Sequence, residues 1–170
     1  MGTDIAGAIS HGLTFPPQAS LPRAMTEGIP PVSPYIRNGW NWLEGYESET
    51  NVRPICTQSG PTVWFARHAI LISTGIGWDQ VAEDGELREQ ILSALFAIAR
   101  FFKSSRIVLL PDDVEPWCNI KDSIIENGST VDELVANLAK IRAPCQDFIS
   151  AIKDAPDYSV DGYLILKVPK

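Results

Sequence analysis

The chain has 170 residues, of which 45% are hydrophobic and 21% are charged, as in an ordinary globular domain rather than a disordered or fibrous protein. Its formal net charge is −7, which disfavours nucleic-acid binding, because that binding needs Lys and Arg side chains to neutralise phosphates. Two histidines and three cysteines without a Cys-x-x-Cys pair argue against a zinc site and a disulfide framework, and favour a reducing compartment.

The first residues predict a strand and no targeting signal. Ile5 and Ile9 are spaced to share one face of a strand near residues 3–10. The segment lacks the basic stretch and the long apolar core of a secretory signal. No apolar run reaches the roughly 18 residues of a membrane span. We therefore expect a cytoplasmic protein that does not bind membranes.

Residues 15–61 are rich in proline and aromatic residues. Between Phe15 and Pro34 the chain carries six of its 13 prolines, which break helices and lack the donor that a sheet needs. The composition predicts an extended segment, either a loop laid over the core or an arm that reaches a partner. We favour the loop, since such composition is usual for surface connections.

An aromatic cluster within this segment is the candidate partner-binding site. Trp and Tyr at this density serve either a core or a contact with another protein. We expect a short helix or turn here and take the cluster as a recognition surface. Its members are Tyr35, Trp40, Trp42 and Tyr46.

Short apolar runs bounded by Gly and Pro predict the strands of a small central sheet. By periodicity alone, the run that follows Gly60-Pro61 fits a buried strand or a buried helix. A later run ends at Pro111. The strands are expected near residues 3–10, 63–72, 106–110 and 162–168.

Apolar residues at three- and four-residue spacing predict amphipathic helices. Asp84 is the expected N-cap of the first helix, Gly128 is the stop of the second, and Thr130 opens a capping box for the third. The helices are expected near residues 86–103, 119–127 and 130–153. Together with the strands they predict an α/β or α+β fold in a single domain of residues 1–170.

A pair of acidic residues is the candidate metal site. Asp112 and Asp113 follow the strand near 106–110, where ligands bind in open α/β sheets. They would hold Mg²⁺, with Asp4 as a third ligand. Ordinary turn chemistry explains the same residues and is the more frequent case. The chain has no phosphate-binding loop, nucleophile elbow or His-Glu-x-x-His motif, so we expect no catalytic residue and no cofactor unless Mg²⁺ binds here.

The first seven residues, Met-Gly-Thr-Asp-Ile-Ala-Gly, resemble the opening of small uncharacterised phage and bacterial proteins that begin Met-Gly-Cys/Thr-Asp-Ile-His. Asn41-Trp42-Leu43 and Pro54-Ile55 are similar to later segments of that group. Ala6 stands where the group has His. The resemblance implies a phage or bacterial origin and a cytosolic location.

Two functions are expected. Small size, acidity and clustered aromatic residues favour a non-catalytic protein, such as an inhibitor, immunity or anti-defence protein that docks on a host protein. The alternative is a metal-assisted hydrolase or nucleotide-binding enzyme that uses Asp4, Asp112 and Asp113. Convergence of these carboxylates with His11 in space would favour the enzyme.

Overall fold

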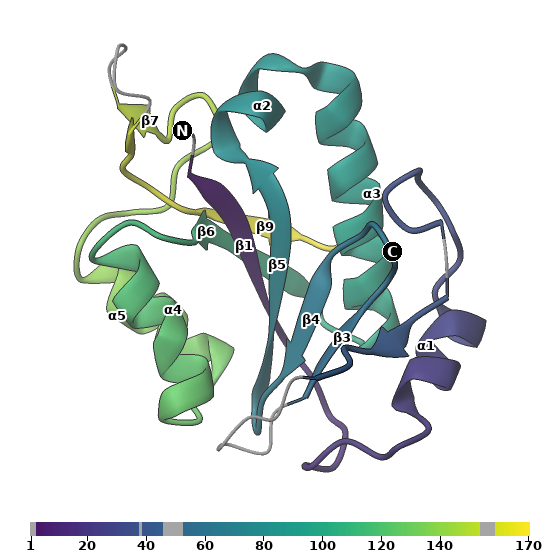
Figure 1. Cartoon of the computed structure of the whole chain (residues 1–170). Helices are drawn as coiled ribbons and strands as arrows, with labels where there is room; N and C mark the ends of the chain where they lie inside the picture. Colours follow the sequence, from purple (N-terminus) through teal and green to yellow (C-terminus); the bar gives the residue numbers. More distant parts are fainter. Residues whose placement is uncertain (1–2, 38, 46–52, 154–158) are drawn as a thin grey trace.

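A seven-stranded sheet forms the centre of the computed structural model, which describes residues 3–37, 39–45, 53–153 and 159–170 (Figure 1). The strand order is β2-β3-β4-β5-β1-β6-β9, and each neighbouring pair is antiparallel. A separate antiparallel pair joins β7 to β8. The bounds are β1 Asp4–Ser10, β2 Asn41–Trp42, β3 Pro54–Cys56, β4 Thr62–Phe65, β5 Ala69–Gly77, β6 Arg106–Pro111, β7 Ile152–Lys153, β8 Ser159–Val160 and β9 Leu164–Lys167.

Helices lie on both faces of this sheet (Figure 1). One face carries α2 (Trp78–Glu83) and α3 (Gly85–Phe101), and the other carries α4 (Trp117–Glu126) and α5 (Val131–Ala139). A further helix, α1 (Leu21–Gly28), packs beside β2. The fold is therefore α+β, one of the two expected classes. Within the described ranges, no helix combines the length and the apolar character needed to cross a membrane.

The N-terminal strand is inserted between two strands that run in the same direction. β1 is antiparallel to both β5 and β6, so α2 and α3 connect β5 to β6 across β1. The connection is therefore a helix-to-strand unit with one strand inserted. Because Asp4 pairs with Gly77 and Ile5 pairs with Pro111, the start of β1 meets the ends of β5 and β6.

Side-chain alternation divides the core into two clusters. Ile5 and Ile9 pack with α3, as the sequence predicts, whereas Ala8 faces α4 and α5. On the second face, the helices rest on β1, β6 and part of β5. Trp64 of β4 lies on this face and is only half-buried. The covering layer therefore ends before β4.

Local capping explains where three of the helices begin or end. Asp84 Oδ1 accepts a hydrogen bond from the Leu87 amide at 3.0 Å, as an N-cap does. Thr130 Oγ1 accepts from the Glu133 amide at 3.1 Å, and Glu133 Oε2 accepts from the Thr130 amide at 2.7 Å. Gly128, with φ of 67°, follows the end of α4. These boundaries confirm the sequence predictions.

The helix expected near 130–153 is too long, since α5 ends at Ala139. Pro144 prevents the helix from continuing to residue 153, because a proline ring clashes with the carbonyl four residues earlier, here that of Lys140. The chain then forms a turn in which the Ser150 amide donates to Asp147 Oδ1 at 2.7 Å. This turn places Phe148 against Trp78, with ring centroids 5.3 Å apart.

The strand expected near 63–72 is two strands, β4 and β5, joined by a tight turn. The Ala66 amide donates to the Ala69 carbonyl at 3.0 Å across that turn. Both turn residues, Arg67 and His68, are exposed. This polar pair interrupts the apolar run. The sequence therefore contained a signal for two strands, which the prediction from periodicity alone ignored.

The described parts of residues 15–61 are more regular than a loop or arm. They contain α1, β2 and β3. Pro22 lies in the first turn of α1, where proline is tolerated because its missing amide would be unpaired in any case. Trp42 lies in β2 and not in the helix or turn expected there.

Candidate functional site

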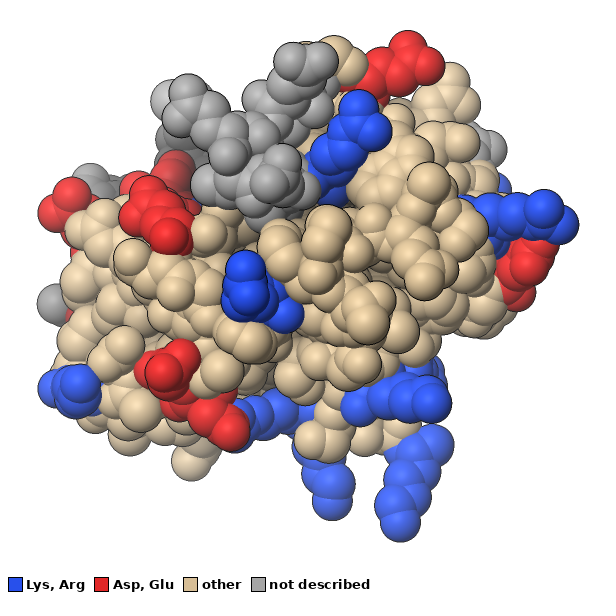
Figure 2. Space-filling model, turned by 90° about the horizontal axis from the view of Figure 1, so that it is seen from below, with Lys and Arg blue, Asp and Glu red and all other residues tan. Residues whose placement is uncertain are grey.

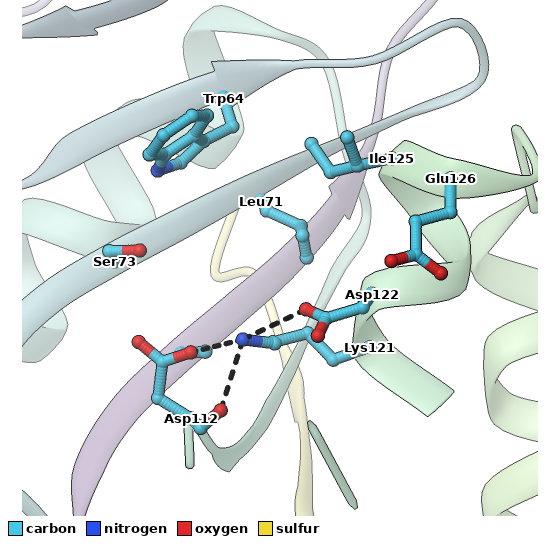
Figure 3. A pocket seen from close by; sticks show the side chains of 9 residues that line it. Trp64, Leu71, Ser73, Asp112, Lys121, Asp122, Ile125 and Glu126 are labelled. Carbon is cyan, nitrogen blue, oxygen red and sulfur yellow. Dashed lines mark hydrogen bonds and ion pairs between the residues drawn. The ribbon is translucent and has the colours of Figure 1, made fainter. Parts of the chain in front are cut away.

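A pocket of about 370 Å³ lies between α4 and the sheet, where the covering layer ends (Figure 3). Strand β1 contributes a small side chain, β5 contributes an aliphatic and a hydroxyl side chain, β4 contributes an indole, and α4 contributes charged groups. Its lining residues are Ala6, Trp64, Leu71, Ser73, Asp112, Lys121, Asp122, Ile125 and Glu126.

The register of α4 explains why its charges face the pocket. Lys121 and Ile125 are four residues apart, as are Asp122 and Glu126, so each pair stacks on one side of the helix. Figure 3 shows the Asp122 and Glu126 carboxylates on the side of α4 that faces the strands. The small side chain of Ala6 leaves space beneath them.

Partners within the pocket hold the Lys121 ammonium. It donates to the Asp112 carboxylate and to the Asp112 carbonyl at 3.0 Å, and it forms an ion pair with Asp122 Oδ1 at 3.2 Å. Two of its three protons are thus used by Asp112, and Asp122 lies beside the third. Burial alone would lower the pKa of Lys121, but the hydrogen bond and charge of Asp112, followed by those of Asp122, raise it overall. Lys121 therefore stays charged.

Acceptors dominate the hydrogen-bonding capacity that the pocket leaves unused. Within the described part of the chain, no group hydrogen-bonds to the Glu126 carboxylate. Asp112 and Asp122 each use one carboxylate oxygen for Lys121, and a carboxylate has about four acceptor positions. With three carboxylates and one ammonium, the lining carries a net negative charge.

A group of carboxylates extends beyond the pocket at the end of the sheet. The Asp112 amide donates to the Asp4 carbonyl at 2.9 Å, which brings Asp112 beside the start of β1. Burial, and then the charges of Asp112, Asp113 and Asp79, raise the pKa of Asp4. Asp4, Asp112 and Asp113 are thus neighbours, as the strand-end argument predicts.

This group does not have the geometry of a metal site. Across residues 3–37, 39–45, 53–153 and 159–170, no three His, Cys, Asp or Glu side chains converge as metal ligands would. The Asp112 carboxylate is instead paired with Lys121. The expected Mg²⁺ site of Asp4, Asp112 and Asp113 therefore has no support from the geometry.

His11 lies at the opposite end of β1 and does not join the carboxylates. Its Nε2 donates to the Ala66 carbonyl at 2.8 Å, and its Nδ1 accepts from the Leu13 amide at 3.3 Å. Burial lowers the pKa of His11, which suits this neutral form. The convergence that would favour a histidine-assisted enzyme is absent.

The aromatic cluster is mostly structural in the residues that the structure describes. Trp40 is 3% exposed and belongs to the core, so its expected place on a recognition surface is wrong. The Tyr35 hydroxyl donates to the Thr74 carbonyl, and burial raises the pKa of Tyr35. Trp42 is half-buried and donates from Nε1 to the Ala19 carbonyl at 3.2 Å. Tyr46 lies outside the described residues.

The sequence argument found Asp112 but missed the residues that surround it. The helix expected near residues 119–127 contains Lys121, Asp122 and Glu126. Its prediction used only the apolar residues, so the charged ones were not considered as site residues. Trp64 belongs to an apolar run that predicts only burial. The signal available was the closely spaced Lys121, Asp122 and Glu126 on a helix that follows Asp112.

Comparisons offer no relative from which a role for these residues can be transferred. No known protein family, no curated protein and no solved structure matches this chain. The role of the pocket is therefore argued from its own residues and their charges.

Proposed function

We propose that this chain is a non-catalytic binding protein whose pocket beside α4 receives a positively charged group of a protein partner. One observation carries the proposal: Asp112 and Asp122 hold the ammonium of Lys121, so the charge that the pocket leaves unpaired is negative. A ligand that brings positive charge and hydrogen-bond donors complements this lining.

The pocket suits the side chain of Arg or Lys in size and in lining. Its volume of about 370 Å³ falls in the range of ligand pockets, roughly 300–1,000 Å³. Leu71 and Ile125 provide apolar surface for a methylene chain. Trp64 provides an indole, whose ring face attracts cations and Arg in particular.

The partner we propose is a protein with an exposed Arg or Lys side chain. The net charge of −7 would steer such a partner toward the pocket. This keeps the expectation of a cytoplasmic phage or bacterial protein that docks on a host protein, and moves the contact from the aromatic cluster to the pocket.

Calorimetric titration with N-acetylarginine amide tests the proposal. We expect saturable binding that weakens about fivefold in Glu126→Gln, the size of a partly exposed charge pair. Glu89→Gln is the matched control, since Glu89 is exposed on α3 and faces away from the pocket. Absence of binding to the unmodified chain, or equal affinity in Glu126→Gln, would overturn the proposal.

A second candidate is an acid–base hydrolase that uses Asp4 and Asp112. The observation that favours it is that burial and like charges raise the pKa of Asp4, whose neighbour Asp112 is ion-paired with Lys121. A carboxyl with a raised pKa suits the role of a general acid.

Assays on ester, glycoside and phosphate substrates test this second candidate. We expect any hydrolysis above the buffer rate to be lost in Asp4→Asn and retained in Asp147→Asn, a control at an exposed turn. A rate that survives Asp4→Asn removes the candidate, as does a chain with no activity.

A further inference from the structure

A second hollow continues the pocket along α4. It has a volume of about 360 Å³ and shares Ile125 and Glu126 with the first pocket. Its other walls are the turn between β4 and β5 and the residues that follow α4, including Arg67, His68 and Asn127. The two hollows therefore lie next to each other along α4, and we call them together the α4 groove, from Asp112 to His68.

The two ends of the α4 groove differ in charge. Asp112, Asp122 and their partner Lys121 line one end, Arg67 lines the other, and Glu126 borders both hollows. The Arg67 guanidinium carbon lies 5.6 Å from the centre of the Phe15 ring, a cation–π contact that holds the side chain in the groove.

Charged groups lie at both ends of the sheet. Asp4, Asp112 and Asp113 lie where β1 begins and β6 ends. β6 begins at the opposite end, and there Arg106 forms an ion pair with Asp132. Figure 2 shows the molecule from below, with Lys and Arg side chains among Asp and Glu side chains. A ligand along the α4 groove therefore meets Asp112 and Asp122 at one end and Arg67 at the other.

The length of the α4 groove sets the size of the ligand. Ser73 and His68 mark its ends along the β5 side. They are five residue steps apart, about 16 Å at about 3.3 Å per residue of strand. An extended peptide of about four residues, with a charged side chain at each end, spans this distance. Leu71 and Ile125 line the middle, where small apolar residues fit.

We propose that the α4 groove binds an extended peptide segment of about four residues, with a basic side chain on the carboxylate oxygens of Asp112 and Asp122 that Lys121 does not use and an acidic side chain at Arg67. This inference rests on the proposed function, since the basic residue is the cation assigned to the pocket. It adds an acidic residue at a fixed distance and makes Arg67 a specificity-determining residue.

A double-mutant cycle between peptide and protein tests the assignment of Arg67. The probes are acetyl-Arg-Ala-Ala-Glu-amide and its Gln counterpart, acetyl-Arg-Ala-Ala-Gln-amide, measured by calorimetry. On the unmodified chain we expect the Glu peptide to bind about fivefold tighter than the Gln peptide, the effect of one partly exposed charge pair. On Arg67→Ala the two peptides should bind equally.

Arg23→Ala is the control for this cycle, because Arg23 is exposed on α1 and pairs with Glu27. It should keep the preference for the Glu peptide. As a charge reversal, Arg67→Glu should prefer acetyl-Arg-Ala-Ala-Arg-amide to the Glu peptide. Far-ultraviolet circular dichroism confirms that each variant is folded.

The failure of this inference and that of the proposed function give different results. If N-acetylarginine amide binds through Glu126 but Arg67→Ala leaves the Glu preference unchanged, the peptide assignment is overturned and the proposed function stands. Equal binding of the Glu and Gln peptides to the unmodified chain has the same meaning. If neither N-acetylarginine amide nor any of the peptides binds, both fail.

Discussion

The two faces of the sheet differ in how completely helices cover them. Toward α3, the strands present large aliphatic side chains such as Ile5, Ile70 and Ile72, all 0% exposed. Toward α4 the strands also bury Val108 and Leu110, but β1 and the end of β5 present the small side chains of Ala6, Ala8 and Ser73, and β4 presents the half-buried Trp64. The first face is closed by a continuous apolar core, and the second retains the α4 groove.

This difference shows how a site arises at the margin of a packed layer. Small side chains on β1 let α4 and α5 approach the sheet. The two helices cover β1, β6 and part of β5, and they do not extend over β4. Charged side chains of α4 then face a space rather than a core, where their carboxylates stay hydrated or bind a ligand. The comparison predicts that changes on the α3 face alter stability alone, whereas changes on the α4 face alter binding as well.

The largest effect is expected from Ile70→Ala. Ile70 is fully buried toward α3, so the substitution leaves a cavity and should lower the free energy of unfolding by about 2–5 kcal/mol. Urea denaturation measures this loss. The affinity for N-acetylarginine amide, measured where the variant is still folded, should not change. A weakened affinity would mean that the two faces are coupled.

Lys121→Met should destabilise the fold and strengthen cation binding. It leaves Asp112 and Asp122 without their partner, which should lower the free energy of unfolding by about 2–3 kcal/mol for a partly buried pair. The same change makes the pocket more negative, so calorimetry should show tighter binding of N-acetylarginine amide. Adding Asp112→Asn should recover part of the stability. Weaker binding in Lys121→Met would show that the ammonium itself contacts the ligand.

Leu71→Ala tests the contrast between the two faces of the sheet, because Leu71 follows Ile70 in β5 and faces α4 instead of α3. Leu71 borders the pocket and is 6% exposed, so water can fill the space that it leaves. We expect a loss of about 1–2 kcal/mol in the free energy of unfolding, close to the transfer cost alone. Binding of N-acetylarginine amide should also weaken. A stability loss as large as that of Ile70→Ala would contradict the contrast between the faces.

The smallest effect is expected from Asp4→Asn, and it depends on pH. Burial and neighbouring carboxylates raise the pKa of Asp4 in the folded chain above its unfolded value, so ionised Asp4 opposes folding. Its favourable contribution is complete below the unfolded pKa and is lost as the pH rises through the folded pKa. The variant should therefore be more stable than the unmodified chain at pH 7, and the gain should vanish in acid. Urea denaturation at pH 3 and pH 7 measures the difference.

Local chemistry explains the parts of the fold that the sequence predicts well. The cap from Asp84 to Leu87, the capping box of Thr130 and Glu133, and Gly128 each involve residues within a few positions of one another. The alternation of Ile5 and Ile9 is equally local. Two boundaries were misplaced because the predictions followed hydrophobic periodicity and ignored residues that interrupt it. Arg67 and His68 form the turn between β4 and β5, and Pro144 prevents α5 from continuing to residue 153.

For the candidate site, the sequence by itself determined that Asp112 follows one strand and that Asp4 begins another, and the structure brought the two together. Only the tertiary structure decided that Trp40 is buried, that Lys121 occupies Asp112 and that α4 stops short of β4. The physical reason is that strand order and helix placement depend on contacts between residues far apart in the chain, such as Ala6 with Leu110 and Ser73. These contacts place α4, whose sequence pattern is that of an ordinary amphipathic helix, along one side of the α4 groove.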